Sequence, residues 1–510
     1  MKWQEIIELF GGKATGAAPN VTDITDASDI ADVSNITDAS DITVKSVAYD
    51  SRKVVPGSVF VCIPGGTVDG HDFAARAVAA GAVALVVTHR VDNIPARIPQ
   101  LLVANPRLAL ARIAEAFYGY PGKKLRILGV TGTNGKTTTT HLLKEILDAC
   151  HRPAGLIGTN HILIGDKVIP ATGTTPESLE ISAYLREMVD SGCTYAVMEV
   201  SSHGLKQGRV SALDFSGSAF TNLTQDHLDY HHDFADYLDS KKLLFTDLRS
   251  DAYAVINRDD PFGAEFLQAA QVKTVTYGLS PEARYYASGI TVDQGGTSFK
   301  LTRNGETFPV YTPLLGNFNV YNALTAIAML ECEGLGLEDI LKALAQVKQV
   351  RGRFEKVKAD AGPTVIVDYA HSPDGLSNIL NTAVAMKKGR LILVFGCGGD
   401  RDKTKRPIMG KIGGSLADLA VVTSDNPRTE DPEAIIAMVE EGVKDSGGDY
   451  LVIPDRREAI KEAIALAQDE DLVVIAGKGH EDYQIIGREK VHFDDFEEAE
   501  KALLARKNSK

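Results

Sequence analysis

A glycine-rich loop between an apolar run and a helical pattern is the feature that most constrains this chain. Residues 125–130 are apolar enough for a buried strand, residues 129–138 read Gly-Val-Thr-Gly-Thr-Asn-Gly-Lys-Thr-Thr, and residues 137–150 have helical periodicity. This order predicts a phosphate-binding loop, because glycine lets main-chain N–H groups close around phosphate oxygens at a helix N-terminus. The first glycine, Gly129, lies one residue earlier than in the G-x-x-x-x-G-K-T pattern.

We expect different roles for the residues of this phosphate-binding loop. Lys136 should reach the β- and γ-phosphates of ATP, and the Thr137 hydroxyl should bind Mg²⁺. The remaining ATP contacts are expected from Gly132, Thr133, Asn134, Gly135 and Thr138. A glycine-rich turn without a ligand is the alternative, and Gly-Lys-Thr-Thr at a strand–helix junction argues against it.

Strand-like and helix-like patterns alternate along most of the chain. Such alternation predicts parallel sheets joined by right-handed crossovers. We therefore expect an α/β protein of three domains in series: 1–122, a central P-loop ATPase domain at 123–349, and a Rossmann-like domain at 350–510. The expected strands are 58–63, 83–87, 125–130, 195–200, 252–257, 364–367, 391–395, 419–422 and 472–476, and the expected helices are 73–80, 137–150, 322–330, 373–385 and 432–440.

Composition excludes several classes of function. The net charge of −14 argues against a nucleic-acid partner, and no apolar run approaches the ~20 residues of a membrane span. The first residues lack the apolar core of a signal peptide. Five scattered cysteines fit reduced thiols that pack in the interior, which favours a cytoplasmic protein: Cys62, Cys150, Cys193, Cys332 and Cys397.

An acidic repeat interrupts the first domain at residues 21–43, where Asp-Ile-Thr-Asp-Ala-Ser-Asp-Ile recurs almost unchanged. A calcium-binding repeat would need glycines to turn its loops, and this stretch has none. We expect a poorly ordered, low-complexity insertion.

Two further groups favour nucleotide chemistry. Glu199 is near the end of the strand expected at 195–200, which is where nucleotide-hydrolysing folds place a Mg²⁺ ligand. An ordinary acid at a sheet edge is the alternative. Residues 221–232, which include His227, are dense in oxygen and imidazole groups and favour a metal or phosphate role.

Five motifs occur in the order typical of one family. They are 132–138 Gly-Thr-Asn-Gly-Lys-Thr-Thr, 198–205 Met-Glu-Val-Ser-Ser-His-Gly-Leu, 226–229 Asp-His-Leu-Asp, 368–371 Asp-Tyr-Ala-His and 399–402 Gly-Asp-Arg-Asp. The chain from about residue 49 onward resembles the Mur ligases, and within them the UDP-N-acetylmuramoyl-tripeptide synthetases. The resemblance implies an ATP-dependent amide ligase of peptidoglycan synthesis that works through an acyl phosphate. The acidic repeat has no counterpart in this pattern.

The resemblance also implies roles for individual residues. Ser51, within Asp-Ser-Arg, would hold the uridine nucleotide, and Lys241 would be carbamylated by CO₂ and would place a second Mg²⁺ with Glu199 and His227. Lys136, Glu199, His227 and Lys241 form the implied catalytic set. The muramyl-peptide contacts would be Thr174, Thr175, Ser201, Gln207 and Arg209. Without the resemblance, Lys241 reads as a solvated helix lysine, and Lys242 leaves a one-residue register error open.

Other implied roles concern the nucleotide and the incoming amine. Asn319 and Asn322 resemble the contacts to the base, and Arg353, Asp368 and His371 resemble the face that the third domain presents to ATP. A capping or core histidine is the alternative for His371. Asp425, Asn426, Pro427 and Arg428 follow the strand expected at 419–422 and resemble the version that takes meso-diaminopimelate, with further contacts from Arg401, Gly477 and Glu481.

Arg428 carries the specificity argument, because a guanidinium can grip a carboxylate through two parallel hydrogen bonds. An Asn-Pro turn with a surface arginine is the alternative reading. The rival functions are a lysine-adding ligase, a ligase like folylpolyglutamate synthetase, and a nucleotide-gated binding protein without catalysis. We expect small-molecule substrates and a monomer.

Overall fold

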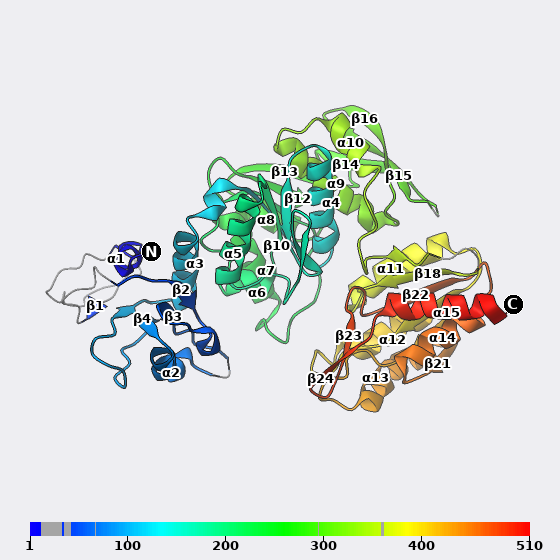
Figure 1. Cartoon of the computed structure of the whole chain (residues 1–510). Helices are drawn as coiled ribbons and strands as arrows, with labels where there is room; N and C mark the ends of the chain where they lie inside the picture. Colours follow the sequence, from blue (N-terminus) through cyan, green and yellow to red (C-terminus); the bar gives the residue numbers. More distant parts are fainter. Residues whose placement is uncertain (12–32, 35–41, 67, 294, 359–361, 510) are drawn as a thin grey trace.

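The computed structural model describes residues 1–11, 33–34, 42–66, 68–293, 295–358 and 362–509. Three α/β units follow one another along an arc, with the first unit at one end and the C-terminal unit at the other (Figure 1). Most of the acidic repeat expected at 21–43 lies outside the described residues. Within the described residues, no helix combines the length and apolar character that a membrane crossing needs.

The first unit contains a five-stranded sheet in the order β1-β5-β4-β3-β2. Its strands are parallel except for β1, which pairs antiparallel with β5. Val59 and Val61 face one apolar cluster and Phe60 faces the other, because alternate side chains of a strand point to opposite faces. The elements are α1 (Trp3–Glu8), β1 (Val33–Ser34), β2 (Ser46–Ala48), η2 (Ser51–Lys53), β3 (Ser58–Val61), η3 (Gly70–Phe73), α2 (Ala74–Ala79), β4 (Ala82–Val87), β5 (Gln100–Leu102) and α3 (Pro106–Phe117).

The middle unit is built on an eleven-stranded sheet, β16-β15-β14-β13-β12-β11-β6-β10-β7-β8-β9. Its central strands are parallel, whereas β7-β8-β9 and β14-β15-β16 are antiparallel. The strands are β6 (Arg126–Thr131), β7 (Ala154–Ile157), β8 (His161–Ile164), β9 (Lys167–Pro170), β10 (Tyr195–Glu199), β11 (Phe215–Phe220), β12 (Tyr253–Asn257), β13 (Lys273–Gly278), β14 (Tyr285–Val292), β15 (Thr297–Arg303) and β16 (Glu306–Thr312). The helices are η4 (Pro121–Lys124), α4 (Lys136–Ala149), α5 (Ser178–Asp190), α6 (Ser202–Lys206), α7 (Phe234–Thr246), α8 (Gly263–Ala269), α9 (Asn317–Cys332) and α10 (Leu337–Leu344).

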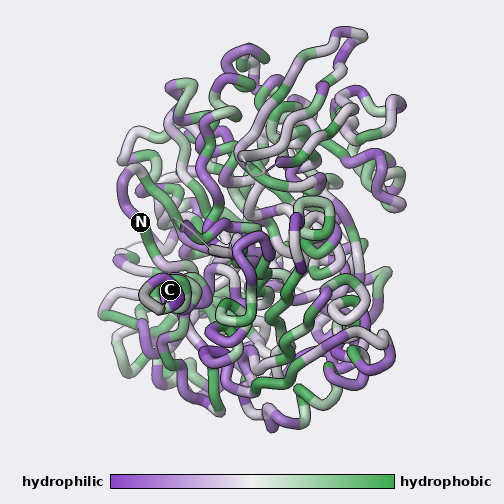
Figure 2. Tube along the Cα trace, turned by 90° about the vertical axis from the view of Figure 1, so that its right-hand side faces the viewer, coloured by the Kyte–Doolittle hydropathy of each residue, from purple (hydrophilic) through white to green (hydrophobic). Residues whose placement is uncertain are grey.

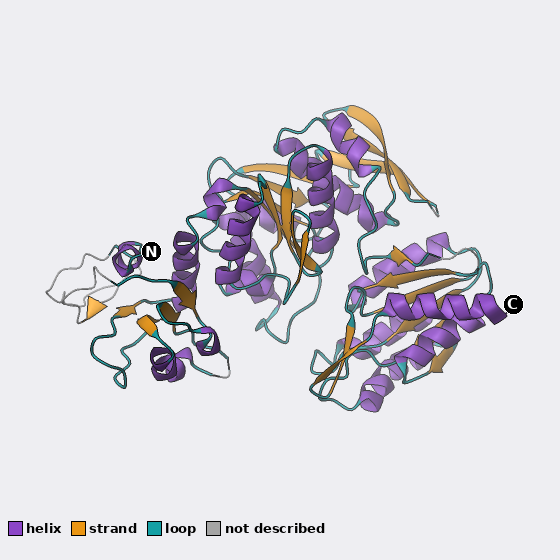
Figure 3. Cartoon of the chain, viewed as in Figure 1, coloured by secondary structure: helices purple, strands orange, loops and turns teal. Residues whose placement is uncertain are grey.

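Both faces of the central sheet are covered by helices (Figure 3). Along β10, Tyr195 and Val197 pack with the cluster under α4 and α9, while Ala196 and Met198 pack with the cluster that contains α5 and α7 residues. Hydrophobic stretches run through the interior and hydrophilic ones predominate in the outer turns (Figure 2). A parallel sheet covered on both faces needs such continuously apolar strands.

The third unit has a six-stranded sheet in the order β17-β18-β22-β19-β20-β21, parallel except for β17. A separate antiparallel hairpin, β23–β24, lies beside it. The strands are β17 (Glu355–Lys356), β18 (Thr364–Asp368), β19 (Leu391–Phe395), β20 (Leu419–Val422), β21 (Tyr450–Val452), β22 (Leu472–Ala476), β23 (Tyr483–Ile486) and β24 (Glu489–His492). The helices are α11 (Pro373–Met386), α12 (Lys405–Leu416), α13 (Pro432–Ser446), α14 (Arg456–Leu466) and α15 (Asp495–Ser509).

Candidate active site

The carboxyl ends of three neighbouring parallel strands meet at the phosphate loop. Val130 of β6 is in register with Glu199 of β10, and Thr131 is in register with Phe220 of β11. The loop after β6 and the buried acid that ends β10 therefore lie at one edge of the sheet. Open α/β sheets bind ligands at this edge.

Two glycines of the loop cannot be replaced without a clash. Gly132 has a φ of 148° and Gly135 a φ of 87°, both of which disfavour other residues. A Cβ at Gly132 would lie 1.9 Å from Thr221 Oγ1, and one at Gly135 would lie 2.6 Å from Asn322 Oδ1. The glycines thus allow the loop to pack closely against the neighbouring strand end and against α9.

The outer side of the loop is bound by Asn222. Its backbone oxygen accepts a hydrogen bond from the Thr133 amide at 2.8 Å, and its Oδ1 accepts one from the Asn134 amide at 2.9 Å. Helix α4 then begins at Lys136, and the first N–H groups of a helix have no partner within the helix. They are available to phosphate oxygens, as the sequence pattern predicts.

Lys136 and Lys241 meet at one acceptor. Lys136 Nζ donates to the backbone oxygens of Gly132 and Thr133 at 2.8 Å each, and Lys241 Nζ donates to Gly132 O at 2.8 Å. Lys241 lies on α7 with 1% of its surface exposed, so it is not the solvated helix lysine of the alternative reading. Burial and the charge of Lys136 bring the pKa of Lys241 well below its usual value.

Glu199 is fully buried and receives three hydrogen bonds. The Thr137 hydroxyl donates to Oε2 at 2.9 Å, the Thr159 amide donates to Oε1 at 2.8 Å, and the Thr159 hydroxyl donates to Oε2 at 2.9 Å. Arg353, which comes from the segment that leads into the third unit, donates to Thr137 Oγ1 at 2.9 Å. The Arg353 guanidinium also lies over the Tyr369 ring, 4.6 Å from its centre.

An imidazole cluster lies next to this loop. The His203 ring is 4.9 Å from the His227 ring and 5.5 Å from the His231 ring. Burial lowers the pKa of His203 to about 4 and that of His227 to about 3, so both rings are neutral near pH 7. Neutral imidazole is the form that binds metal ions. His227 has a left-handed backbone with a φ of 56°.

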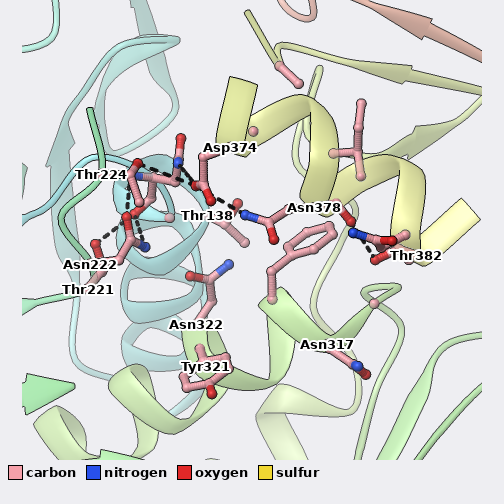
Figure 4. A pocket seen from close by; sticks show the side chains of 18 of the residues that line it. Thr138, Thr221, Asn222, Thr224, Asn317, Tyr321, Asn322, Asp374, Asn378 and Thr382 are labelled. Atoms are coloured by element: carbon pink, nitrogen blue, oxygen red, sulfur yellow. Dashed lines mark hydrogen bonds between the residues drawn. The ribbon is translucent and has the colours of Figure 1, made fainter. Parts of the chain in front are cut away.

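A cavity of about 620 Å³ lies between the loop and the third unit (Figure 4). Thr138, Thr221 and Asn322 line it from the middle unit, and Asn378 and Thr382 of α11 line the opposite side. Of the sequence-predicted ATP residues, the cavity lining includes Asn134, Gly135, Thr138, Asn322, Arg353, Asp368 and His371.

Asn319 does not line this cavity. Its Oδ1 accepts a hydrogen bond from Asn322 Nδ2 at 2.9 Å, and its Nδ2 donates to Leu315 O at 2.8 Å. Asn322 lines the cavity, and Asn319 accepts a hydrogen bond from the Asn322 side-chain amide. A direct contact between Asn319 and the base stays a prediction.

Asp368 and His371 lie where β18 ends. The Asp368 carboxylate accepts hydrogen bonds from the Phe354 and Ala370 amides, both at 2.7 Å, and burial raises its pKa to about 6. His371 Nδ1 lies 2.8 Å from Tyr369 O, and the His371 oxygen accepts a hydrogen bond from Lys405 Nζ at 2.8 Å.

A second cavity of about 530 Å³ contains most of the residues predicted for the amino acid. Asp425, Asn426, Gly477 and Glu481 lie at its buried end, and Arg401 and Arg428 also line it. His227 lines its other side, and Tyr369, His371, Ser372 and Asp374 line both cavities. Pro427 is not in the lining; its oxygen packs against Gly399, where a Cβ would lie 1.9 Å away.

Arg428 is held by its backbone in a left-handed conformation, with a φ of 52°. Its amide donates to Ile485 O at 3.0 Å, and its oxygen accepts from the Gly487 amide at 2.7 Å, so the β23–β24 hairpin fixes it. Its Nη1 donates to Gly399 O at 2.7 Å. Asp400, also left-handed with a φ of 53°, lies in the same neighbourhood.

The residues predicted for the muramyl peptide form a linked group in the middle unit. Thr175 Oγ1 donates to Glu199 O at 2.9 Å and accepts from the Ser201 amide at 2.9 Å. Arg209 donates to Thr175 O at 2.5 Å and binds Gln207 Oε1 through two nitrogens. Thr174 Oγ1 lies 3.1 Å from Thr159 Oγ1, within hydrogen-bonding distance.

Ser51 belongs to the first unit, in η2. Beside it, Tyr49 Oη donates to Glu180 Oε1 of α5 at 2.9 Å. Arg107 of α3 also reaches α5, where it pairs with Glu177 at 3.1 Å. Glu177 pairs with Arg209 as well, at 3.1 Å, so the contact between the two units adjoins the predicted precursor residues.

Several polar residues that contact the predicted site residues carry no motif that would single them out. Thr159, Asp374, Lys405 and Lys478 each bind a predicted site residue. Asp374 Oδ2 accepts a hydrogen bond from Asn134 Nδ2 at 2.8 Å, and both residues line the first cavity. Asp374 and Lys478 lie next to the predicted motifs in the sequence, and proximity to these motifs is the one signal that could have found them.

Three family descriptions match successive parts of the chain. The Mur ligase family catalytic domain matches residues 43–118, the Mur ligase middle domain matches residues 130–330, and the Mur ligase glutamate ligase domain matches residues 352–479. The matched parts contain the loop, both cavities' main motifs and Ser51.

Similar proteins carry one enzyme name. The UDP-N-acetylmuramoyl-L-alanyl-D-glutamate–2,6-diaminopimelate ligase of Geobacillus kaustophilus is 46% identical over 469 residues, 91% of this chain and 95% of the relative. The enzyme of that name from Bacillus licheniformis is 48% identical over 467 residues, 90% of this chain and 95% of the relative. A solved structure of that name is similar with a TM-score of 0.66 and 35% identity, and covers 91% of this chain and 95% of its own.

A more distant structure shares the fold. The Mycobacterium tuberculosis folylpolyglutamate synthase complexed with ADP has a TM-score of 0.63 at 23% identity, over 74% of this chain and 93% of its own. The closer relatives cover the whole series of three units, and on that extent of identity the chain belongs to the Mur ligase family.

Proposed function

We propose that this chain uses ATP to join meso-2,6-diaminopimelate to UDP-N-acetylmuramoyl-L-alanyl-D-glutamate in peptidoglycan synthesis. One observation carries the proposal: the cavity beside the phosphate loop and the cavity with Arg428 and Glu481 adjoin, because four residues line both. A carboxylate phosphorylated at the loop is therefore next to an amine held in the third unit. The names of the similar enzymes support the same substrates.

The reaction has two bond-forming steps. A carboxylate oxygen of the D-glutamyl residue bonds to the γ-phosphorus of ATP, and the bond from that phosphorus to ADP breaks. The free amine of diaminopimelate then bonds to the acyl carbon, and the carbon–oxygen bond to phosphate breaks. The nitrogen loses a proton to solvent or base, and the products are the amide, ADP and inorganic phosphate.

In the first step two anions, the carboxylate and the γ-phosphate, approach each other. The loop can reduce the repulsion between them. The N–H groups at the start of α4 and the Lys136 ammonium offer positive charge to the β- and γ-phosphates. Burial lowers the pKa of Lys136, and phosphate oxygens next to the ammonium would favour its charged form again. The ADP leaving group is thus stabilised where its charge develops.

The residues around Glu199 fit a magnesium ion. Its carboxylate is fully buried and accepts hydrogen bonds from the Thr137 hydroxyl and from the amide and hydroxyl of Thr159. The described residues contain no group of three or more His, Cys, Asp or Glu side chains arranged for a metal. Thr137 and Glu199 would hold one ion, with phosphate oxygens and water as its other ligands, and His227 would help to hold a second. Bound Mg²⁺ would neutralise charge on the transferred phosphoryl group.

We further propose that Lys241 carries a carbamate derived from CO₂. A neutral amine is required to attack CO₂, and burial beside Lys136 favours that neutral form. The carbamate anion forms with release of a proton and would pair with the Lys136 ammonium. It would add a negative ligand next to His227, whereas Lys242, whose Nζ pairs with Asp239 at 3.1 Å, has an anionic partner already.

The substrates and the cysteines bear on the compartment. UDP-linked precursors and ATP are cytoplasmic metabolites, and the five free cysteines are typical of a reducing compartment. We propose a cytoplasmic monomer. Sedimentation of the active enzyme tests the assembly, and a dimer mass at assay concentration would contradict it.

Release of ADP tests the function. The purified chain should form ADP only when UDP-N-acetylmuramoyl-L-alanyl-D-glutamate, diaminopimelate and Mg²⁺ are all present. Competition between diaminopimelate and L-lysine should yield the diaminopimelate product in excess. Lysine product in excess would identify the lysine-adding ligase, and precursor binding without turnover would identify a binding protein.

A further inference from the structure

A buried lysine lies under the proposed amino-acid site. Lys478 has no exposed surface and lies between the predicted contact residues Gly477 and Glu481. Burying an ammonium is unfavourable unless it is paired and hydrogen-bonded. Its partners therefore indicate what it does.

Lys478 binds two of the residues that are predicted for the amino-acid site, Asn426 and Glu481. Its Nζ donates to Asn426 Oδ1 at 3.0 Å and contacts Glu481 Oε2 at 3.4 Å. Asn426 Nδ2 donates to the same Glu481 oxygen at 2.8 Å. Three side chains thus form a closed set of hydrogen bonds.

The lysine fixes the direction of the Asn426 amide. An ammonium has only donors, so the amide must turn its oxygen toward Lys478. The Ile485 amide donates to that same oxygen at 2.9 Å and supports this orientation. The NH₂ group of Asn426 must then point at Glu481. The Lys478 ammonium and this NH₂ group both bind Glu481 Oε2, and neither of them binds Oε1.

The turn that carries Lys478 is packed too tightly for other residues. Gly477 has a φ of 128° and Gly479 a φ of 55°. A Cβ at Gly477 would lie 2.5 Å from Asp425 Oδ2, and one at Gly479 would lie 2.6 Å from the Tyr369 Cβ. The position of the ammonium is therefore set by the backbone on both sides.

Charged side chains lie close together beneath this cavity. Arg456 and Asp495 neutralise each other through two hydrogen bonds of 2.7 Å, and both side chains are fully buried. Lys478 and Arg456 both lower the pKa of the buried Asp425 carboxyl, and Lys478 also contacts Glu481. Burial and the charge of Asp425 raise the pKa of Glu481.

We propose that Lys478 is a positioning residue of the amino-acid site, where its ammonium holds Asn426 and Glu481 in the orientation that receives the distal ammonium of the incoming diamino acid. The inference rests on the proposed function, and it adds a residue to that function. The distal ammonium of a bound diamino acid would pair with the Glu481 carboxylate. A ligand without the distal amino group would leave that carboxylate without this partner.

Steady-state kinetics of Lys478→Met test this role, with Lys461→Met, an exposed lysine on α14, as the matched control. Without the ammonium, the Asn426 amide is no longer held in one orientation and the site becomes more negative by one charge. The KM for diaminopimelate should therefore rise about tenfold or more. The KM for ATP should stay within about twofold, because the loop belongs to another unit. An unchanged KM for diaminopimelate, or an equal rise for both substrates, would overturn the proposal.

A second substrate separates positioning from general damage. 2-Aminopimelate lacks the distal amino group, and the unmodified enzyme should use it poorly. Lys478→Met should reduce the difference in kcat/KM between diaminopimelate and 2-aminopimelate. The double variant with Glu481→Gln should lose little more kcat/KM for diaminopimelate than Glu481→Gln alone. Losses that multiply would show that Lys478 acts without Glu481 and would overturn the inference.

If Lys478→Met fails to fold, Lys478→Arg carries the same test, because a larger planar group in a fully buried place must displace Asn426. A KM for diaminopimelate unchanged in this variant would again contradict the role. Failure of the proposed function has a different result: the unmodified enzyme would release no ADP with diaminopimelate present.

Discussion

Lys136 and Lys241 donate hydrogen bonds to the same backbone oxygen, that of Gly132, at 2.8 Å each. One side chain comes from the start of α4 and the other from α7. Two ammonium groups at one carbonyl repel each other, and this repulsion adds to burial in lowering the pKa of Lys241. An anionic group on Lys241 would turn the repulsion into attraction.

The carbamate on Lys241 can be tested against its neighbour. Lys241→Met should lower kcat by about 10² or more, because a charged group near the phosphoryl transfer is lost. Lys242→Met should have little effect, since that side chain pairs with Asp239 and Glu265 outside the site. Carbon-13 NMR after exposure to labelled bicarbonate should show a carbamate signal that Lys241→Met removes. A larger loss in Lys242→Met would move the assignment by one residue.

Replacing the loop lysine should abolish phosphoryl transfer. Lys136→Met removes the cation next to the β- and γ-phosphates, and we expect kcat to fall by about 10²–10³ while the fold is kept. ADP release measures the loss. Lys300→Met, an exposed lysine on β15, is the control for loss of a positive charge. Near-normal turnover in Lys136→Met would exclude the proposed mechanism.

Arg428 should decide between diaminopimelate and lysine. Arg428→Ala removes a partner for the distal carboxylate, and we expect kcat/KM for diaminopimelate to fall by about 10²–10³, which lies within the range of about 2–5 kcal/mol for a truncated charge pair. The KM for ATP should change little, because Arg428 does not line the first cavity. Competition assays with both amino acids measure the ratio. Equal losses for diaminopimelate and lysine would remove the specificity argument.

The hydrogen bond from Asn134 to Asp374 links the phosphate loop to α11 at 2.8 Å. Breaking it with Asp374→Ala should weaken ADP binding by about twofold to tenfold, the range of one net hydrogen bond of about 0.5–1.5 kcal/mol. Calorimetric titration with ADP measures the change. A double-mutant cycle with Asn134→Ala supplies the control, and additive effects would show that the two side chains do not act together.

Acid stability should depend on Glu430. Hydrogen bonds from Arg406 lower its pKa from 4.5 to about 2 in the folded chain. The stability that Glu430 contributes is therefore complete above about 4.5, the pKa in the unfolded state, and is lost as the pH falls toward about 2. Glu430→Gln should reduce the free energy of unfolding at pH 7 and flatten its decline between these values.

Urea denaturation at several pH values measures this free energy. Glu433→Gln, on the exposed first turn of α13, is the matched control and should keep the slope of the unmodified chain. A pH dependence that is the same in Glu430→Gln and in the unmodified chain would contradict the assignment.

The sequence predicts the parallel core well, because its strands are continuous apolar runs that end in turn residues. The runs at 391–395, 419–422 and 472–476 coincide with β19, β20 and β22, and the helix expected at 373–385 is α11 (Pro373–Met386). The helix expected at 322–330 begins five residues earlier, at Asn317 in α9 (Asn317–Cys332), since Gly316 precedes it with a φ of 99°.

The antiparallel edges of the middle sheet were not predicted. Residues 285–312 form β14, β15 and β16, whose exposed and buried positions alternate with a period of two. Asn304-Gly305, with φ values of 50° and 82°, forms the turn between β15 and β16, and Asn-Gly is a strong hairpin signal. The signal was present locally, whereas pairing with the central sheet depends on residues far away in the sequence.

In the candidate site, too, the sequence predicts local features but not the contacts between distant residues. Motifs predict which loops carry polar groups, and the parallel strand ends explain why Val130 and Glu199 lie side by side. Contacts between units, such as Asn134 with Asp374, depend on tertiary placement and have no periodic signature. Lys478 was missed because a lysine in a sequence reads as solvated, and its burial is visible only after the β23–β24 hairpin and β20 are placed around it.

His227, Asp400 and Arg428 hold the left-handed backbone described above, at a cost of roughly 1–2 kcal/mol for each non-glycine residue. Glycine would relax these positions, but it would also remove the His227 imidazole and the Arg428 guanidinium from the lining of the second cavity. A screen for thermal stability alone would therefore enrich variants that lose turnover. Stability and turnover thus favour different residues at positions 227 and 428.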